Sequence, residues 1–250
     1  MYIEAIKTHR IEPKESLEAL LDHYILYLLE KDIIVITSKI ISICQGRFIS
    51  KEEISKEVLI RQEADLILET KQNPFDLYLT IKDGILIPSA GIDESNVHGV
   101  YILYPQDVQK TAFSLWKYLR KKYSIQNLGI LITDSHTTPM RRGVTGIALG
   151  WCGFEPLYSY INKPDIYGNP LHVTQVNILD ALATSAVFVM GEGNEQTPLS
   201  LIRNAPKISF LDRPPTLDEE RNIAIPIEED LYSPLLMSAK WIKGKNCEIP

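Results

Sequence analysis

The chain has 250 residues, 45% of them hydrophobic, which is enough to bury a sizeable core. Its formal net charge of -6 at pH 7 excludes a general nucleic-acid surface, because such surfaces need clustered Lys and Arg. Cys44, Cys152 and Cys247 are too widely spaced for a disulfide framework or a zinc knuckle, and no apolar run is long enough to span a bilayer. We therefore predict a soluble, cytoplasmic protein with no nucleic-acid or membrane partner.

The first third of the chain predicts a strand, a helix and a buried strand in succession. Residues 3–7 have a strand pattern, and Glu15 to Glu30 carries leucines at helical spacing. The β-branched run Ile33 to Thr37 predicts a buried strand. Residues 38–45 continue as a mixed apolar segment, and Lys51 to Lys71 alternates charged and aliphatic residues as a partly exposed helix does.

The middle of the chain predicts a hairpin and a helix. Asp83-Gly84 is the strongest hairpin signal of the sequence, and it separates the strand candidates Leu77 to Thr80 and Ile85 to Ile87. Val108 to Tyr123 has helical spacing, and its basic residues come late, where the helix dipole favours them.

The second half predicts a buried strand from Leu128 to Thr133, a glycine-rich segment and a helix. The glycines between residues 143 and 153 imply close approaches that a side chain would block. Asn177 to Met190 is a helix candidate rich in small residues, and Leu217 to Arg221 is a short acidic one in a proline-interrupted tail.

Three acidic side chains stand out as candidate ligands of a divalent cation. Asp93 shares a turn with Asn96, and Asp134 ends the strand that begins at Leu128. Glu192 lies in a glycine-flanked loop and adds a third oxygen donor. Magnesium and manganese take such oxygen ligands together with phosphate and water, so the set indicates phosphate chemistry. Each residue alone is also explained as an ordinary turn or helix cap.

Several basic and hydroxyl side chains could meet an anion. Arg141 and Arg142 can each bind a carboxylate or phosphate through two hydrogen bonds, unless they form a solvated basic turn. Ser38 and Lys39 follow a buried strand and could contact a phosphate. His136 is a possible acid or base, although a lone histidine is more often structural. The phosphate-binding loop with lysine and hydroxyl at the required spacing is absent.

Read in order, these motifs resemble the coenzyme F420-0:L-glutamate ligase family. The resembling blocks are Thr37 to Ser42 with Gly46-Arg47, Ala90 to Val97, Ile132 to Asp134, Arg141 to Gly150, Asp165 to Gly168, and Val189 to Gly193.

The resemblance implies an α+β fold with mixed, largely antiparallel sheets and flanking helices. It implies one gamma-glutamyl ligase-like domain over residues 1–250, which could form two lobes with the tail from about residue 205 to 250 packed on it. It further implies an intertwined homodimer that uses GTP to join L-glutamate to a cofactor precursor through an acyl phosphate. Two Mg²⁺ or Mn²⁺ ions per site are implied, with K⁺ as a further candidate cofactor.

The resemblance also assigns roles to individual residues. Asp93 and Asp134 would hold one cation, while Ser135 and Glu192 would help to hold a second. Arg141 or Arg142 would hold a carboxylate or steady the acyl phosphate. The residues implied to contact the nucleotide are Ser38, Lys39, Ser42, Asn96, Met190, Gly191, Gly193, Asn194 and Glu195.

Four residues at three sites depart from the family pattern. Ser135 stands where the family usually has threonine, Ile43 replaces a lysine, and Thr137-Thr138 replaces a glycine-arginine pair near the presumed acceptor. The last change keeps open a related ligase that acts on a folate or other pterin-like acceptor. The loss of the lysine keeps open a non-catalytic nucleotide-binding protein.

Overall fold

The computed structural model describes residues 1–69 and 73–244, and the chain within it divides into two compact units. The first unit is formed by residues 1–44 and 107–216, and the second by residues 45–106 and 217–250. The mixed α+β architecture with largely antiparallel sheets confirms the predicted fold class at that level.

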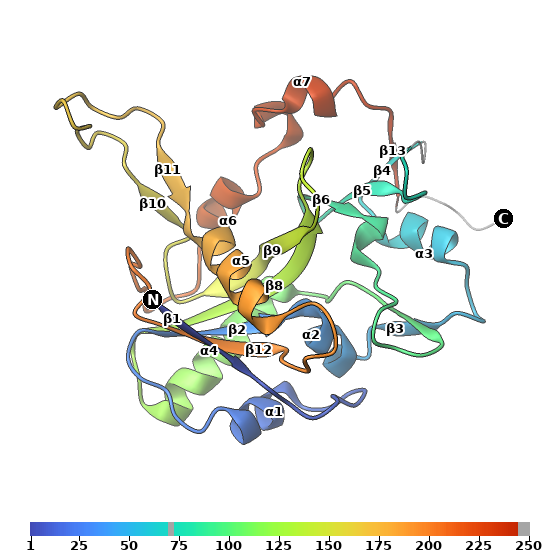
Figure 1. Ribbon diagram of the computed structural model, residues 1–250, viewed down its shortest axis with the longest axis horizontal. Coiled ribbons are helices and arrows are strands. Elements are labelled where there is room, and N and C mark those ends of the chain that lie inside the picture. The colour runs from blue at the N-terminus through green and yellow to red at the C-terminus, as the bar shows by residue number, and fades with distance from the viewer. Residues whose placement is uncertain (70–72, 245–250) are drawn as a thin grey trace. The chain divides into compact units, whose positions relative to one another are not determined.

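A five-stranded sheet of order β1-β12-β2-β8-β9 forms the centre of the first unit (Figure 1). Its strands are β1 (Tyr2–Ile6), β12 (Leu199–Arg203), β2 (Asp32–Thr37), β8 (Leu128–Thr137) and β9 (Val144–Cys152). Only β2 and β8 pair in parallel; the other neighbours are antiparallel. The aliphatic residues 33–36 and 130–132 are fully buried, as expected of central strands covered on both faces.

Helices α4 (Val108–Tyr123) and α5 (Ile178–Met190) pack on opposite sides of this sheet (Figure 1). Both match their predicted ranges, and Asn177 caps α5 by accepting a hydrogen bond from the Asp180 amide at 3.0 Å. Two glycines of β9 allow the helices to approach. A side chain at Gly146 would meet the Ala183 carbonyl of α5, and one at Gly150 would meet Val108 of α4. The expected close approaches are therefore confirmed.

Gly146 and Gly150 meet different helices because β9 contains a bulge between them. Ile132 pairs with Gly150, but the next residue, Thr133, pairs with Ala148, so Leu149 is the extra residue. An extra residue reverses which face each following side chain takes. The bulge therefore lets one strand place glycines under both helices.

The first predicted helix is shorter than expected. Helix α1 (Leu17–Tyr24) begins after its cap Ser16 and ends at Ile25, whereas the leucine pattern predicted a helix to Glu30. Tertiary contacts hold the remaining residues out of the helix. Tyr123 donates to the Ile25 carbonyl, and the Glu30 carboxylate accepts two backbone N–H bonds at 2.8 Å from residues 126 and 127.

Residues 157–177 form a long hairpin, which we call the arm (yellow to orange in Figure 1). Strands β10 (Leu157–Ser159) and β11 (Gln175–Asn177) pair at its base. Backbone bonds continue along it, from Tyr160 to Thr174 and from Asn162 to Leu171. The predicted turn at Asp165 closes its end, because that carboxylate accepts the backbone N–H of Tyr167 and Asn169 at 2.8 Å each.

The second unit is built on a four-stranded sheet of order β13-β4-β5-β6. Strands β5 (Leu79–Lys82) and β6 (Ile85–Pro88) form the hairpin predicted at Asp83-Gly84. Strands β4 (Leu66–Leu68) and β13 (Trp241–Lys243) complete the sheet, while β3 (Phe48–Ser50) pairs separately with β7 (Val100–Ile102).

The helix predicted from Lys51 to Lys71 is wrong over most of its length. Helix α3 occupies only Lys56–Glu63, between the cap Ser55 and the extended residue Ala64, and the chain then enters β4. Pairing with β5 and β13 outweighs the helical charge pattern of this segment. Lys71, at the end of this predicted helix, lies outside the described residues, as does Cys247.

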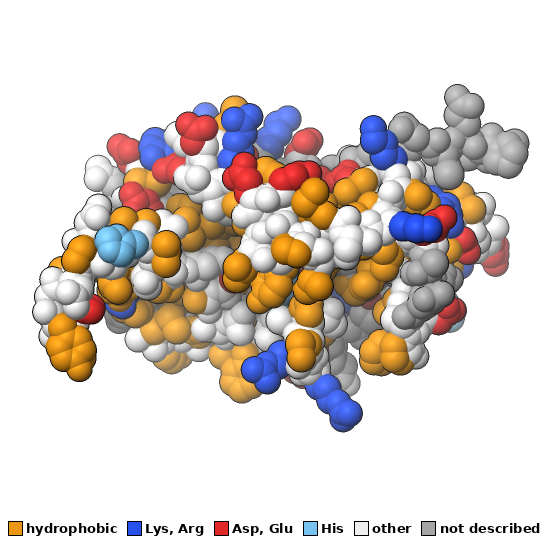
Figure 2. Space-filling model, turned by 90° about the horizontal axis from the view of Figure 1, so that it is seen from above, with side chains coloured by type: hydrophobic (Ala, Val, Ile, Leu, Met, Phe, Trp, Pro, Cys, Tyr) orange, Lys and Arg blue, Asp and Glu red, His pale blue; other side chains and the backbone are white. Residues whose placement is uncertain are grey.

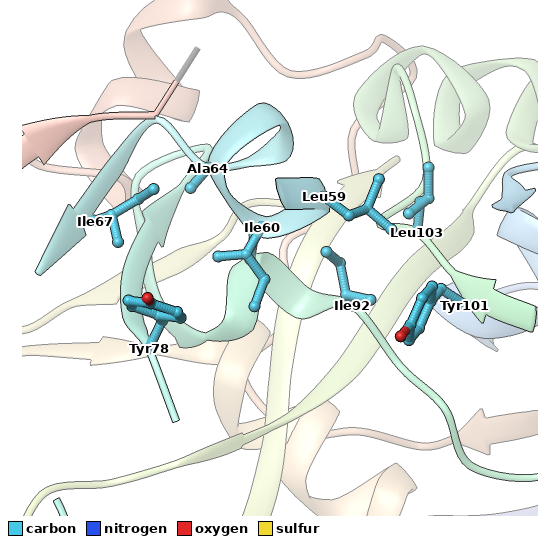
Figure 3. Close-up of a cluster of buried hydrophobic side chains, with 9 residues drawn as sticks. Leu59, Ile60, Ala64, Ile67, Tyr78, Ile92, Tyr101 and Leu103 are labelled. Atoms are coloured by element: carbon cyan, nitrogen blue, oxygen red, sulfur yellow. The ribbon is translucent and has the colours of Figure 1, made fainter. Parts of the chain in front are cut away.

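Helix α3 and the strands around it enclose the core of the second unit (Figure 3). Leu59 and Ile60 of α3 lie in one buried cluster with Ile92 and with the rings of Tyr78 and Tyr101. The core residues are Leu59, Ile60, Ala64, Ile67, Tyr78, Ala90, Ile92, Tyr101 and Leu103. This cluster supports the short 3-10 turn η1 (Ser89–Gly91), which leads to Asp93.

The remaining elements belong to the C-terminal part of the second unit. They are α6 (Leu217–Ile223), η2 (Ile227–Glu229) and α7 (Ser233–Leu236), and the predicted short acidic helix is confirmed in α6. Large hydrophobic side chains are visible on the surface of the molecule (Figure 2). Within the described residues, none of the helices has the length and apolar character needed to cross a membrane.

Candidate functional site

Asp134 and Ser135 lie within strand β8, beside the bulge, so the strand does not end at Asp134 as predicted. The strand continues to Thr137 because Asp134 pairs with Ile147 and Ser135 with Gly146. The Ser135 amide donates to Asp134 Oδ1 at 2.8 Å, so backbone and carboxylate are held together. Both side chains are half-buried. A bulge next to a polar strand residue commonly re-aims side chains at functional sites.

Asp180, in the first turn of α5, fixes this bulge and was missed by the sequence analysis. Its Oδ1 accepts the Ala148 amide at 2.9 Å, directly beside the extra residue, and its Oδ2 accepts the Asn177 side chain at 2.6 Å. The cap spacing Asn177-x-x-Asp180 is a signal that could have identified it. Asp180 thus ties the helix N-terminus to the strand beside Asp134.

Ser38 and Lys39 come to the same sheet edge as Asp134. Strands β2 and β8 are parallel, and Thr37 pairs with Thr133, so the chain leaves both strands at neighbouring positions. Helix α2 (Ser38–Gln45) begins directly after β2. Ligands of such sheets bind outside the carboxyl ends of the strands, where the helix N-terminus favours anions.

Two buried hydroxyl groups at this edge lack protein partners. Ser42 Oγ in α2 and Thr133 Oγ1 in β8 have no hydrogen-bond partner in the part of the chain that the structure describes. Buried polar groups without partners are uncommon, and each calls for an explanation such as a bound ligand. Ile43, which departs from the family pattern, is half-buried in the same helix.

The loop after α5 is held by its own residues. Gly191 has φ 81° and ψ 168°, a conformation that is essentially restricted to glycine. The Glu195 carboxylate accepts the Gly193 amide at 2.8 Å, and a side chain at Gly191 would collide with that carboxylate. Glu192 and Asn194 are exposed on the loop, and the buried Met190 anchors its start.

Arg141 and Arg142 lie at the turn between β8 and β9. The Arg141 amide donates to the Thr138 carbonyl at 3.2 Å, and Met140 has a positive φ of 61°. Both guanidinium groups belong to exposed residues, and across residues 1–69 and 73–244 neither forms an ion pair. Thr137-Thr138, the other departure from the family pattern, is exposed at the same turn.

Asp93 and Asn96 belong to the second unit, whereas Asp134, Ser135 and Glu192 belong to the first. Asp93 exchanges two backbone hydrogen bonds of 2.9 Å with Ile102. Its carboxylate accepts the Ser95 amide at 2.7 Å and the Ser95 hydroxyl at 3.1 Å. Asn96 has a positive φ of 55° and is exposed.

Ion pairs on Glu94 hold this loop. Lys51 Nζ lies 2.6 Å and Lys56 Nζ 2.5 Å from the Glu94 carboxylate oxygens, and the two lysines come from different segments. Hydrogen bonds from Lys51 and then Lys56 hold the pKa of the Glu94 carboxyl below its ordinary value. Glu94, next to Asp93, is therefore held by ion pairs and not by strand pairing.

The surroundings of the two described cysteines and of His136 favour structural roles. Burial raises the pKa of the Cys44 and Cys152 thiols to about 12, so both are protonated at neutral pH. His136 Nδ1 lies 3.2 Å from the Thr145 carbonyl on the neighbouring strand. This contact favours the structural interpretation of the histidine.

The donor groups suit a hard cation, although the protein does not provide a complete cage. In the described ranges, no group of three or more His, Cys, Asp or Glu side chains is arranged to hold a metal ion. Magnesium is commonly bound by one or two carboxylates, with phosphate and water at its other positions. Carboxylates of the kind found at Asp93, Asp134 and Glu192 fit that chemistry.

Comparison with known proteins gives consistent matches over most of the chain. The family model described as F420-0:Gamma-glutamyl ligase matches residues 5–204. A protein of Methanocaldococcus jannaschii named coenzyme F420:L-glutamate ligase is 31% identical over 218 residues, which cover 80% of this chain and 84% of the relative. Proteins of the same name from Methanothermobacter thermautotrophicus and Methanopyrus kandleri are 32% and 30% identical, covering 72% and 70% of this chain and 77% and 75% of the relatives.

Proposed function

The chain belongs to the F420-0:gamma-glutamyl ligase family, and on that premise we propose that it is a GTP-dependent ligase that joins L-glutamate to a coenzyme F420 precursor. The observation that carries the proposal is the family match over residues 5–204, which includes Asp93, Asp134 and Glu192. The edge formed by β2 and β8, with Ser38 beside Asp134, supports a nucleotide site in the first unit.

The reaction we propose has two steps. A carboxylate oxygen of the precursor attacks the γ-phosphorus of GTP, the bond to the β-phosphate oxygen breaks, and GDP leaves. The glutamate nitrogen then attacks the carbonyl carbon of the acyl phosphate, loses a proton, and expels inorganic phosphate. Activation is needed because a free carboxylate is a poor electrophile, and positioning supplies much of the rate.

We assign to these residues the roles that the family resemblance implies. Ser38, Lys39 and Ser42 would meet phosphate oxygens at the start of α2, and the loop from Met190 to Glu195, with Asn96, would hold the nucleotide. Arg141 and Arg142 would bind the reacting carboxylate through paired hydrogen bonds.

Asp93, Asp134, Ser135 and Glu192 are the residues that would hold Mg²⁺ or Mn²⁺, with K⁺ as a further candidate. A divalent cation bound there would offset the negative charge of the terminal phosphate. These carboxylates would also orient the nucleotide relative to Arg141.

Mass spectrometry tests the proposal directly. The protein would be incubated with GTP, L-glutamate, Mn²⁺ and the F420 precursor, and the precursor should gain the mass of one glutamyl unit. Omitting glutamate should abolish the gain. GTP binding without any glutamate-dependent product would instead support a nucleotide-binding protein without ligase activity.

A second candidate acceptor is folate or another pterin-like molecule. The exposed Thr137-Thr138, beside Arg141, supports it, because this turn replaces the glycine-arginine pair of the family pattern. Parallel assays with folate and the F420 precursor separate the two, since only the true acceptor should gain a glutamyl unit.

We also propose that the protein is a cytoplasmic homodimer. The two described cysteines are free thiols, as suits a reducing compartment. The end of the arm exposes 91% of Ile166 and 84% of Tyr167, an apolar pair that a second copy of the chain would cover. Light scattering should give the dimer mass for the native chain and the monomer mass for Ile166→Asp. A native monomer would rule the proposal out.

A further inference from the structure

Two tyrosines lie side by side at the base of the arm, and neither is among the residues proposed to bind the nucleotide or the cations. Tyr158 lies in β10, and Tyr160 follows two residues later, so both side chains take the same face of the hairpin. Their ring centroids are 5.0 Å apart in an edge-on arrangement of 74°. Both residues are half-buried, so their hydroxyl groups have defined surroundings.

Two lysines converge on these rings from separate segments. Lys163 Nζ lies 4.1 Å from the Tyr158 ring centroid and 3.0 Å from the Tyr158 hydroxyl oxygen. Lys207 Nζ lies 4.9 Å from the Tyr160 ring centroid and donates to the Tyr160 hydroxyl. Lys207 has a positive φ of 64°, an uncommon conformation for a residue other than glycine. Both ammonium groups are thus held within 5.3 Å of the Tyr158 ring centroid and within 5.3 Å of the Tyr160 ring centroid.

No carboxylate among the described residues neutralises either ammonium group. In the segments that the structure describes, Lys163 and Lys207 form no ion pair with a carboxylate, although the chain has an excess of acidic residues. Hydrogen bonding to Lys163, together with the charges of Lys163 and Lys207, lowers the pKa of the Tyr158 hydroxyl. Two ammonium groups over the same pair of rings make the local potential positive, so an anion bound beside them would be stabilised.

The lysine–tyrosine hydrogen bonds leave further N–H and O–H donors available to a ligand. Each ammonium group has several N–H donors, and the tyrosine hydroxyl takes one of them. Each tyrosine hydroxyl accepts from its lysine, so its own O–H can donate. The four side chains therefore present both N–H and O–H donors to one region.

We propose that Tyr158, Tyr160, Lys163 and Lys207 form a binding site for an anionic oxygen group of a small molecule. A carboxylate and a phosphate share the required chemistry, since both accept charge-assisted hydrogen bonds. In the proposed ligase, the carboxylates of L-glutamate are the first source and a phosphate group is the second. Only this choice of ligand rests on the proposed function; the site itself does not.

Direct binding measurements test the site without any turnover. Isothermal titration calorimetry would measure inorganic phosphate and L-glutamate separately against the full chain and the variant Lys163→Gln/Lys207→Gln. The variant should bind one of the two at least about tenfold more weakly, because charge-assisted bonds are lost. Weaker binding of phosphate by the variant would identify a phosphate subsite, and weaker binding of glutamate would identify a carboxylate subsite.

A matched control removes the same charge elsewhere in the first unit. Lys110→Gln/Lys121→Gln changes two exposed lysines of α4 and should bind both probes as the native chain does. Equal binding of both probes by the two double variants, or no saturable binding by the native chain, would overturn the proposal. Thermal unfolding of each variant checks that the fold is retained.

The variant Tyr158→Phe/Tyr160→Phe separates ligand binding from support of the arm. It keeps both ammonium groups and removes the hydroxyl donors, so it should weaken the same probe by a smaller factor than the lysine variant. If the native chain shows no glutamate-dependent product but the lysine variant loses anion binding, the ligase proposal fails and this site stands. If the native chain forms the glutamate-dependent product but its anion binding does not depend on the lysines, the ligase proposal stands and this site fails.

Discussion

Asp134 and Asp93 are the two proposed ligands of one cation, but the protein holds them by different means. Asp134 lies in a strand of the five-stranded sheet, where backbone pairing, the bulge and Asp180 fix it. Asp93 pairs through its backbone with Ile102 in an isolated bridge outside the named strands, and the ion pairs of Glu94 with Lys51 and Lys56 hold the loop. Backbone pairing responds little to salt, whereas exposed ion pairs are screened by it. The two positions should therefore fail under different conditions.

Asp134→Asn should have the largest effect. Loss of the carboxylate should lower turnover at least about 100-fold, because charge in the transition state loses its support. The unfolding free energy should change little, since the asparagine oxygen can still accept the Ser135 amide. Asp93→Asn should give a loss of the same order if both residues hold one cation. Steady-state kinetics over a manganese titration measure both, and normal activity with normal metal dependence would remove Asp134 from the site.

Gly191→Ala tests a backbone-determined part of the first unit. Alanine at φ 81° and ψ 168° is strained by roughly 1–3 kcal/mol, and its side chain would displace Glu195. We expect GTP affinity to fall about tenfold, as measured by calorimetry. Gly84→Ala is the matched control, because it adds a side chain at φ +77° in the β5–β6 turn. Unchanged GTP affinity in Gly191→Ala would show that the loop does not contact the nucleotide.

Asp180→Ala should destabilise the first unit by about 1–2 kcal/mol, since it leaves the Ala148 amide unpaired and weakens the cap of α5. Activity should also fall, because the bulge beside Asp134 loses its support. Urea unfolding at low and high salt should give the same loss. Asp180→Asn keeps an acceptor oxygen and should lose less. A loss that disappears in salt would contradict support by the hydrogen bond from the Ala148 amide to Asp180.

Glu94→Gln should have the smallest effect, about 0.5 kcal/mol at low salt, because the pairs with Lys51 and Lys56 are partly exposed. The folded pKa of Glu94 is lowered, so its contribution is present above the ordinary value of 4.5 and is lost as the pH falls through the folded pKa. Urea unfolding of both proteins against pH should show the difference vanish in acid. In 1 M salt the difference should shrink, unlike that of Asp180→Ala. A difference that does not depend on salt would contradict the inference that ion pairs hold the loop of Asp93.

The sequence by itself determined the elements whose signals are local. Val108–Tyr123 follows from its helical spacing, and the hairpin at Asp83-Gly84 from its turn residues. The motif blocks around Asp93, Asp134 and Glu192 also predicted the family, which the comparisons confirmed. These features depend on residues close together in the chain, so they could be predicted from the sequence alone.

Only the tertiary structure determined those features in which contacts between distant segments outweigh the local sequence pattern. The helix from Glu15 stops early because Tyr123 and the backbone near Asn127 bind its continuation. Strand β8 continues through Asp134 because β9 pairs with it, and the role of Asp180 depends on the bulge at Leu149. The gathering of Lys163 and Lys207 on two tyrosines depends on a turn far along the chain. Such contacts join residues distant in sequence, and no periodicity or propensity encodes which of them will meet.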